Sequence, residues 1–305
     1  MAEPQGTSAS NAERAGVAAM IGATLLWGGT FVVIRDSVRS LDPVTLVFLR
    51  FSAAAALLGS IAVWLRPRFD RAAWIGGALG GLCAAAGYLC QAIGLQSTTA
   101  GTSAFLTCMG TLFAALFAWP LLAQRPSGLL LSGIALALAG SALLPSEGAL
   151  NLGPGEMWTL LGSIAYALQI VVLSKYAPSA APIAIALIQT ATLALALTPF
   201  VRAPFTALAD LQHSDLLRLA YLAIAGSTIA PYLHITAQRV LPAGRIGLLF
   251  ALEPVFALGF AVTMGGEHFA GHWWIGAGLI LAGVVGVEFV EFRKAARYTR
   301  ASARS

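Results

Sequence analysis

Side chains able to bind a small molecule occur inside long apolar stretches of the sequence. Three pairs join an aromatic residue to a hydrogen-bonding residue three positions later: Trp27 with Thr30, Tyr88 with Gln91, and Tyr166 with Gln169. Because residues three apart lie on one face of an α-helix, each pair can face a common cavity. Tyr232 and His234 form a fourth candidate pair. Aromatic rings with a few amide and hydroxyl groups suit amino acids or similar metabolites, so these residues are the predicted substrate-binding set.

Two ionisable residues also lie within apolar stretches, where charges are costly and are candidates for function. Glu253 lies about eight residues, roughly 12 Å, into its stretch and precedes Pro254. It is either a proton-coupling carboxylate or a structural group at a helix break, where proline frees a backbone carbonyl. Arg50 lies about six residues into its stretch, where it could either extend to the interface or attract a substrate carboxylate.

Residues for catalysis, metal binding or a cofactor are scarce. The sequence has four histidines, and its three cysteines, Cys83, Cys90 and Cys108, form no CxxC pair. The serine, aspartyl and metal motifs of intramembrane enzymes are absent, and so is a glycine-rich phosphate-binding loop. We therefore expect no enzyme, no metal and no cofactor, and keep an intramembrane enzyme as a remote alternative. A channel also stays open, although no filter loop or ring of charge stands out.

The elements that position these residues are membrane helices. Hydrophobic residues make up 58% of the chain and charged residues only 10%, against about 25% charged in soluble domains. A bilayer core requires about 20 mostly apolar residues per helix, and lipid-exposed backbone must bond within its own segment. Ten segments satisfy this: 16–35, 44–65, 72–95, 101–123, 129–145, 155–174, 181–201, 216–238, 245–264 and 273–291.

The distribution of basic residues predicts the orientation of these helices. Of the 18 lysines and arginines, 13 fall on the side that holds both termini and four on the opposite side. Since basic loops stay in the cytoplasm, both termini are predicted to be cytoplasmic, which requires an even number of spans. Residues 1–14 then form a cytoplasmic N-terminus. Residues 292–305 form a basic tail that we expect to contact anionic membrane lipids.

The chain also matches itself weakly. At a shift of 139, Trp27 falls on Tyr166 and Pro43 on Pro182; at a shift of 143, the matches are Ala100-Gly101 with Ala243-Gly244, Phe113 with Phe256, Gly133 with Gly276 and Gly140 with Gly283. Two repeats follow, over 15–146 and 152–291. Five spans per repeat place the second repeat upside down relative to the first, an architecture of secondary transporters that bind substrate at the midplane between the halves.

Several motifs resemble a known family. The segment from Gly22 to Phe31, Asp42-Pro43 before Leu49-Arg50-Phe51, and the stretch from Ala243 through Glu253-Pro254 to Gly266-Glu267 resemble the EamA family of the drug/metabolite transporter superfamily. The first half has Gly110-Thr111 where the second has Glu-Pro. The resemblance implies a ten-helix carrier in the bacterial inner membrane that exports amino acids and other metabolites.

The predicted function is therefore alternating-access export of small metabolites, with amino acids, including aromatic or apolar ones, as the expected substrates. Exporters of lipophilic cations or drugs, and sugar or nucleotide-sugar carriers, are the alternatives. The resemblance places a glutamate in the first helix of small multidrug exporters, and residues 16–35 contain no carboxylate. Phosphate-bearing substrates would favour basic cavity residues, and only Arg50 and His234 are candidates. We expect no nucleic-acid partner, and the sequence leaves the oligomeric state open.

Overall fold

The described parts of the chain, residues 5–144, 153–264 and 271–302, are helical in the computed structural model and contain no strand. The all-helical class predicted from the sequence is thus confirmed for these residues. Gly266-Glu267, which end the motif that begins at Ala243, and the boundary between the repeats at 146–152 lie outside them. So do residues 1–4 and 303–305 of the predicted terminal segments, and side chains are described only for residues 11–294 within these ranges.

The first half of the chain forms five helices and the second half a more interrupted series. The first five are α1 (Gln5–Ser37), α2 (Pro43–Leu65), α3 (Arg71–Gly94), α4 (Ala100–Leu122) and α5 (Gly128–Ser141). The later elements are α6 (Pro154–Tyr176), the 3₁₀ turn η1 (Ala177–Ser179), α7 (Pro182–Leu197), the 3₁₀ turn η2 (Thr198–Phe200), α8 (Pro204–Ala209), α9 (His213–Tyr221), the π-helical segment η3 (Leu222–Ile229), α10 (Ala230–Gln238), α11 (Ala243–Phe250), α12 (Glu253–Thr263) and α13 (Trp273–Ser302).

Short polar caps begin the helices of the first half. The side chains of Asp42, Asp70, Thr99 and Ser127 each accept a hydrogen bond from a backbone N–H in the first turn of the helix that follows. Such caps satisfy amides that have no partner inside the helix. In α2, α6 and α7 a proline occupies the start of the helix, where its missing N–H costs nothing. Because the first turn of each of these helices needs no further hydrogen-bond partners, short loops are enough to connect the helices.

Nine helical stretches within the described residues are long and apolar enough to cross a membrane. Two of them are composite, since α9, η3 and α10 together form one stretch and α11 with α12 forms another. The predicted span 129–145 corresponds to α5, whose 14 residues extend only about 21 Å of the roughly 30 Å core. The chain is an integral membrane protein, and the count of ten spans stays a prediction.

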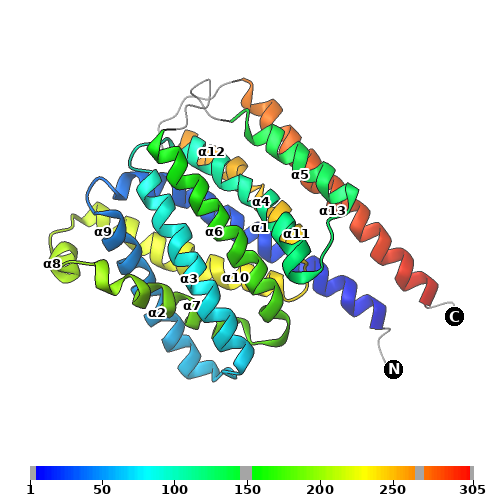
Figure 1. Ribbon diagram of the computed structural model, residues 1–305, viewed down its shortest axis with the longest axis horizontal. Helices are drawn as coiled ribbons and strands as arrows, with labels where there is room; N and C mark the ends of the chain where they lie inside the picture. The colour runs from blue at the N-terminus through cyan, green and yellow to red at the C-terminus, as the bar shows by residue number, and fades with distance from the viewer. Residues whose placement is uncertain (1–4, 145–152, 265–270, 303–305) are drawn as a thin grey trace.

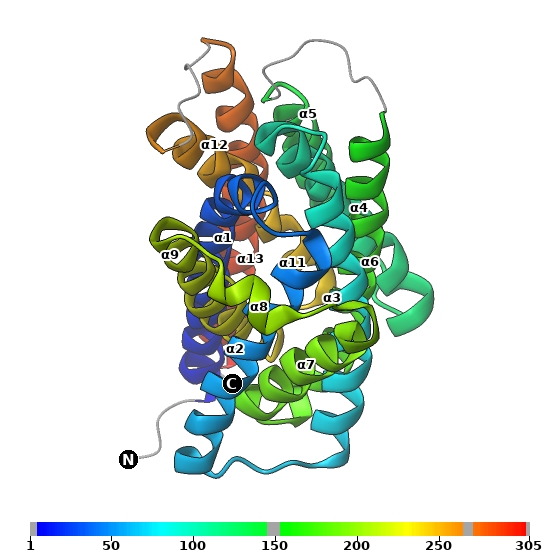
Figure 2. The ribbon, with the colours of Figure 1, turned by 90° about the vertical axis from the view of Figure 1, so that its left-hand side faces the viewer.

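Helices of the two halves interleave. The most extensive packing is between α3 and both α6 and α7, between α4 and α6, between α5 and α13, between α2 and α7, and between α1 and both α10 and α12. Figure 1 shows α5 and α13 as a pair along one edge of the bundle, with the start of α1 and the end of α13 at the same end of the molecule. Figure 2 shows that α6 and α1, which begin the two halves, lie on either side of the interior. The bundle centre is therefore lined by both halves.

Glycines allow the contact between α5 and α13. A Cβ on Gly140 would lie 2.4 Å from the carbonyl oxygen of Gly276, and one on Gly283 would lie 2.6 Å from that of Gly133. No side chain fits at such distances, so the two backbones touch directly. Small residues at such crossings are typical of membrane helix pairs, whose association depends on close packing.

Candidate functional site

A cavity lies where α1, α3, α4 and α6 meet the break between α11 and α12. Its lining comes from both halves of the chain: Trp27, Thr30, Tyr88, Gln91, Thr107, Gly110, Thr111, Tyr166, Gln169, Ile170, Phe250 and Glu253. The cavity has a volume of about 40 Å³.

Aromatic rings hold one another in place around this cavity. Trp27 stacks on Phe250 with 5.2 Å between ring centroids, and the edge of Tyr88 meets Tyr166 at 5.2 Å. The Trp27 indole Nε1 donates a hydrogen bond of 2.9 Å to the carbonyl oxygen of Gly226 in η3. Each ring is fixed by a neighbour, so the cavity has rigid apolar faces on which a flat or branched side chain can pack.

Polar groups with unused hydrogen-bonding capacity line the same space. Tyr166 donates its hydroxyl to Oε1 of Gln91, and Nε2 of Gln169 donates to Gln189, both at 3.2 Å. These bonds involve the Gln91 oxygen and the Gln169 nitrogen, so within the described residues the Gln91 amide nitrogen and the Gln169 carbonyl oxygen make no hydrogen bond. The buried hydroxyls of Thr107 and Thr111 likewise make no hydrogen bond to the described part of the chain. Unsatisfied buried polar groups are costly, and a polar ligand would satisfy them.

Glu253 contributes a carboxylate at the first residue of α12. The helical axis is interrupted at Ala251 and Leu252, and Pro254 then starts α12 without a backbone N–H to satisfy. The Glu253 side chain is 6% exposed and lines the cavity. None of the described residues forms a hydrogen bond or ion pair with it. A carboxylate at the end of a broken membrane helix, facing a cavity, is an arrangement typical of ligand or ion sites in transporters.

Arg50 lies one layer behind the cavity wall. Its guanidinium lies 5.1 Å from the ring centroids of both Phe51 and Tyr88, and its Nε donates a 2.7 Å hydrogen bond to Ser227 in η3. The residue is 1% exposed, and its Nη2 has no hydrogen-bond partner among the described residues. The sequence allowed Arg50 to extend to the interface; instead it is buried behind Tyr88.

The pair Tyr232 and His234 is not brought to the cavity. Tyr232 is 38% exposed on the outer surface of α10. His234 is buried behind the wall, edge-on to both Trp27 and Phe250, and its ring nitrogens have no partner in the described part of the chain. Residues two apart project about 200° apart around a helix, so this pair cannot share one face as the other three pairs do. Of the predicted set, the remaining six residues and Glu253 line the cavity.

Sequence reasoning missed five lining residues: Thr107, Gly110, Thr111, Ile170 and Phe250. The three on α4 are spaced three and four apart, the one-face spacing that identified the other pairs. That signal was available in the sequence. Ile170 and Phe250 are apolar residues in apolar helices, and nothing in their type or spacing separates them from residues that face lipid.

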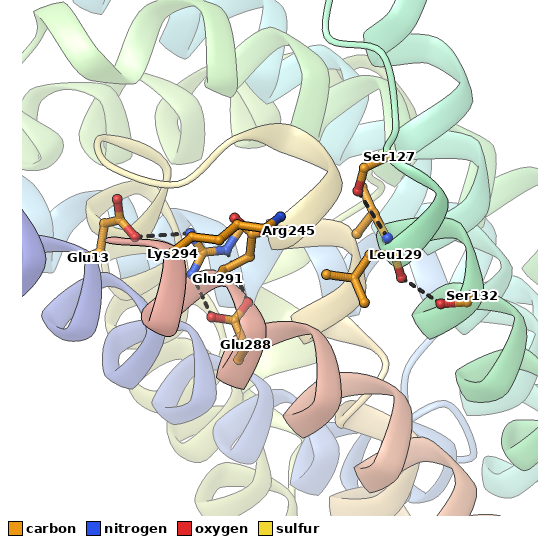
Figure 3. A network of polar contacts seen from close by, with 9 residues as sticks. Glu13, Ser127, Leu129, Ser132, Arg245, Glu288, Glu291 and Lys294 are labelled. Carbon is orange, nitrogen blue, oxygen red and sulfur yellow. Dashed lines mark hydrogen bonds and ion pairs between the residues drawn. The ribbon is translucent and has the colours of Figure 1, made fainter. Parts of the chain in front are cut away.

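A second polar cluster lies near the end of the bundle that holds both termini. Arg245 of α11 makes two hydrogen bonds to Glu288 of α13, of 3.1 Å from Nε and 2.5 Å from Nη2, and a third of 3.1 Å to Glu13 of α1 (Figure 3). Arg245 and Glu288 are almost fully buried, whereas the Glu13 side chain is one-third exposed. The cluster ties three helices together. No three His, Cys, Asp or Glu side chains in the described residues lie close enough to hold a metal ion.

Comparisons with known proteins agree with this architecture. The model of the EamA-like transporter family matches residues 14–145 and again residues 153–289. An uncharacterized transporter of Archaeoglobus fulgidus is 25% identical over 262 residues, 86% of this chain and 82% of its own length. The uncharacterized inner membrane transporter YedA of Escherichia coli is 29% identical over 280 residues, 88% of each chain. A solved structure, described only as a crystal structure of a protein, has a TM-score of 0.73 and 22% identity and covers 92% of this chain and 98% of its own.

Proposed function

The chain belongs to the EamA-like transporter family, and from this premise we propose that it is a secondary transporter that exports small metabolites, chiefly amino acids, by alternating access. The observation that carries the proposal is the buried cavity between the two halves. Its rings offer apolar faces, and Thr107 and Thr111 offer buried hydroxyls that the described protein leaves unsatisfied. A few polar groups in an apolar cavity are what fix the orientation of a small ligand.

Reciprocal contacts support the two inverted repeats that alternating access requires. The predicted repeat pairs Gly133 with Gly276 and Gly140 with Gly283, and the structure packs Gly140 on Gly276 and Gly133 on Gly283. A twofold operation that exchanges the halves converts each of these contacts into the other. If the halves exchange conformations, the cavity opens to the other side of the membrane at little cost in free energy.

The proposed direction of transport comes from the family resemblance, and the proposed orientation in the membrane comes from the distribution of basic residues. We propose an inner-membrane protein with both termini in the cytoplasm, because basic residues concentrate on that side. The similarity to YedA, named as an inner membrane transporter, supports the location. Export as the direction follows from the family resemblance.

Lipophilic cations are a second candidate, because Glu253 and four aromatic rings line one cavity. A carboxylate surrounded by ring faces attracts organic cations. Sugar phosphates are disfavoured, since none of the described lining residues is basic. An enzymatic role has no support from the comparisons, because the relatives from Archaeoglobus fulgidus and Escherichia coli are both named as transporters.

Counterflow in liposomes tests the proposal. The purified protein is reconstituted, loaded with unlabelled amino acids and assayed for uptake of each labelled member of the panel. Trp27→Ala and Tyr166→Ala should each lower exchange about tenfold, since one aromatic contact contributes about 1–1.5 kcal/mol. Tyr232→Ala removes an aromatic ring outside the cavity and should leave exchange unchanged. Correctly inserted wild-type protein that exchanges no amino acid would refute the assignment.

A further inference from the structure

A second cavity lies at the end of the bundle that holds both termini. Its volume is about 310 Å³, and its lining includes Arg125 and Ser127 after α4, Arg245 of α11 and Lys294 of α13. Arg125 and Ser127 are exposed, and the Lys294 side chain is 53% exposed. The second cavity therefore reaches the solvent, whereas the first cavity is enclosed by buried side chains.

The two cavities follow one another along a single face of α4. Thr107, Gly110 and Thr111 line the first cavity, and Ala115 and Ala118 line the second. Residues three and four apart share a helix face, so these five positions form one continuous stripe. Thr111 and Ala115 are about 6 Å apart along the helix axis. About one helical turn of α4 thus separates the solvent-connected cavity from the first cavity.

The helix α11 forms the partition at that turn. Phe250 at the end of α11 lines the first cavity, and Gly244 near its start lines the second. Between them, α11 packs directly on α4: a Cβ on Gly247 would lie 3.1 Å from the carbonyl oxygen of Thr111 and 3.4 Å from the Cβ of Ala114. This contact falls between the two sets of lining residues, so it closes the way from one cavity to the other.

The partition is a short helix that is interrupted at both ends. It spans only the eight residues Ala243–Phe250. The loop through Leu241 and Pro242 precedes it, and the break at Ala251 and Leu252 follows it. Such a helix can tilt as a unit, because the change in backbone angles is confined to a few residues at its ends.

Polar side chains hold the first turn of α11 in place. Arg245 binds Glu288 of α13 and Glu13 of α1 (Figure 3). Gln124, in the loop after α4, accepts a hydrogen bond of 3.2 Å from the backbone N–H of Ala243. Of the two carboxylates, Glu13 is the more exposed, and exposed pairs are the weaker ones. These bonds connect α11 to three other elements at the end where the second cavity opens.

We propose that the second cavity is an entry site on the transport path and that α11 is the gate between it and the first cavity, held shut by Arg245 with Glu13 and Glu288. The inference rests on the proposed transport function and adds its path. When α11 tilts away from α4, the contact at Gly247 opens and the two cavities join. Substrate then reaches the first cavity from the side that holds both termini, the cytoplasm in the orientation proposed above.

A reversible cross-link between α4 and α11 tests the gate. The three native cysteines, all free in the structure, are replaced with alanine, and Ala114→Cys is combined with Gly247→Cys. The 3.4 Å between these two Cβ positions is close to the Cβ–Cβ distance of a disulfide, about 3.5–4.5 Å. Mild oxidation should therefore join the two helices, and the loss of free thiols measures how completely it does so.

Counterflow of an amino acid that the wild type exchanges is compared before and after oxidation. Exchange should fall at least about tenfold in the cross-linked protein and return when the disulfide is reduced. Ala114→Cys and Gly247→Cys alone cannot form this bond and should exchange equally in oxidant and reductant. Cross-linked protein that exchanges at the reduced rate would overturn the gate.

Labelling of the first cavity is a second measurement, and it leaves the contact at Gly247 unchanged. In the cysteine-free protein, Thr107→Cys places one thiol on the cavity wall, and its rate of reaction with a water-soluble maleimide reports opening. Glu13→Gln removes the more exposed partner of Arg245 and should raise that rate about two- to fivefold. An unchanged rate would overturn the role of Arg245 in holding the gate.

Two controls separate opening of the gate from general loosening. Arg239→Gln removes an exposed charge beside the loop that precedes α11 and should leave the labelling of Thr107→Cys unchanged. A thiol at Thr190, buried in α7 outside the lining of both cavities, should not respond to Glu13→Gln. Faster labelling at both thiols would mean that Glu13 only stabilises the fold, which would also overturn the inference.

The outcomes also separate the gate from the transport proposal. If exchange continues through the cross-linked protein, the transport proposal stands and the path is wrong. If the wild type exchanges no amino acid, the transport proposal is wrong, and the labelling rates alone decide whether α11 opens. If the cysteine pair does not fold, the labelling rates decide in the same way.

Discussion

Replacing Arg245 with methionine should destabilise the protein severely, because it removes the centre of the buried cluster in Figure 3. The arginine gives Glu288 two hydrogen bonds in a near-parallel pair and gives Glu13 a third. Methionine matches the length and packing of the arginine stem but offers no donor. Glu288, whose side chain is only 8% exposed, would be left as a charge without compensation.

The magnitude follows from the burial of each partner. Breaking a buried ion pair by removing one member costs about 3–5 kcal/mol, which is the expected loss for Arg245→Met. Glu13→Gln removes a partner whose side chain is 32% exposed, and such pairs contribute about 1 kcal/mol or less. Replacing both members, as in Arg245→Met with Glu288→Met, removes the uncompensated charge. Such apolar replacements are often neutral or stabilising, so the double variant should recover most of the loss.

Reversible unfolding in mixed micelles, titrated with sodium dodecyl sulfate and followed by circular dichroism, measures these differences. The expected order of stability places wild type and Glu13→Gln close together, the double variant next, and Arg245→Met far below. The reasoning is refuted if Glu13→Gln costs as much as Arg245→Met. It is also refuted if the double variant is no more stable than the single one, because uncompensated charge would then not be the cause.

Three further predictions concern the contact between α5 and α13, the hydroxyl of Thr111 and the hydrogen bond from Trp27 to Gly226. Gly276→Ala should cost about 1–3 kcal/mol of stability by overpacking, because its Cβ would lie 2.7 Å from the Gly140 carbonyl oxygen. Gly278→Ala on the same helix is the control, since its Cβ meets no described atom within 4 Å. In the same unfolding titration this control should be neutral or stabilising. Thr111→Val keeps the shape and removes an unpaired hydroxyl, so stability should hold or rise while the KM of counterflow increases; an unchanged KM would show that Thr111 does not contact substrate. Trp27→Phe removes the hydrogen bond to Gly226 and should cost about 1 kcal/mol of stability, and an unchanged unfolding midpoint would contradict that role.

Much of the candidate site could be anticipated from residue type and spacing. The spacing of three between Trp27 and Thr30 predicted that they share a helix face, and the structure places both on the cavity wall. The spacing of three likewise predicted that Tyr88 and Gln91, and Tyr166 and Gln169, share a face. Their role in binding remains part of the proposal.

Other features were decided by packing between distant segments. The partner of Arg245 is 43 residues away in α13, and the sequence alone treats Arg245 as one more basic residue near a helix end. Nothing in the sequence shows that Arg50 would be buried against Ser227 and Tyr88. The aromatic neighbours of His234, and the outward direction of Tyr232, also follow from the rotation of α10 in the bundle.

The sequence by itself determines that this chain forms apolar helices in a membrane, where they begin, and which rare polar groups they carry. It does so because charge is scarce, because caps and prolines mark helix starts, and because polar groups at membrane depth need a reason to be there. Only the tertiary structure decides which face of each helix meets the cavity. In a soluble helix the apolar stripe would reveal the buried face, but lipid is as apolar as the protein interior, so residues such as Phe250 and Ile170 carry no sign of which way they point.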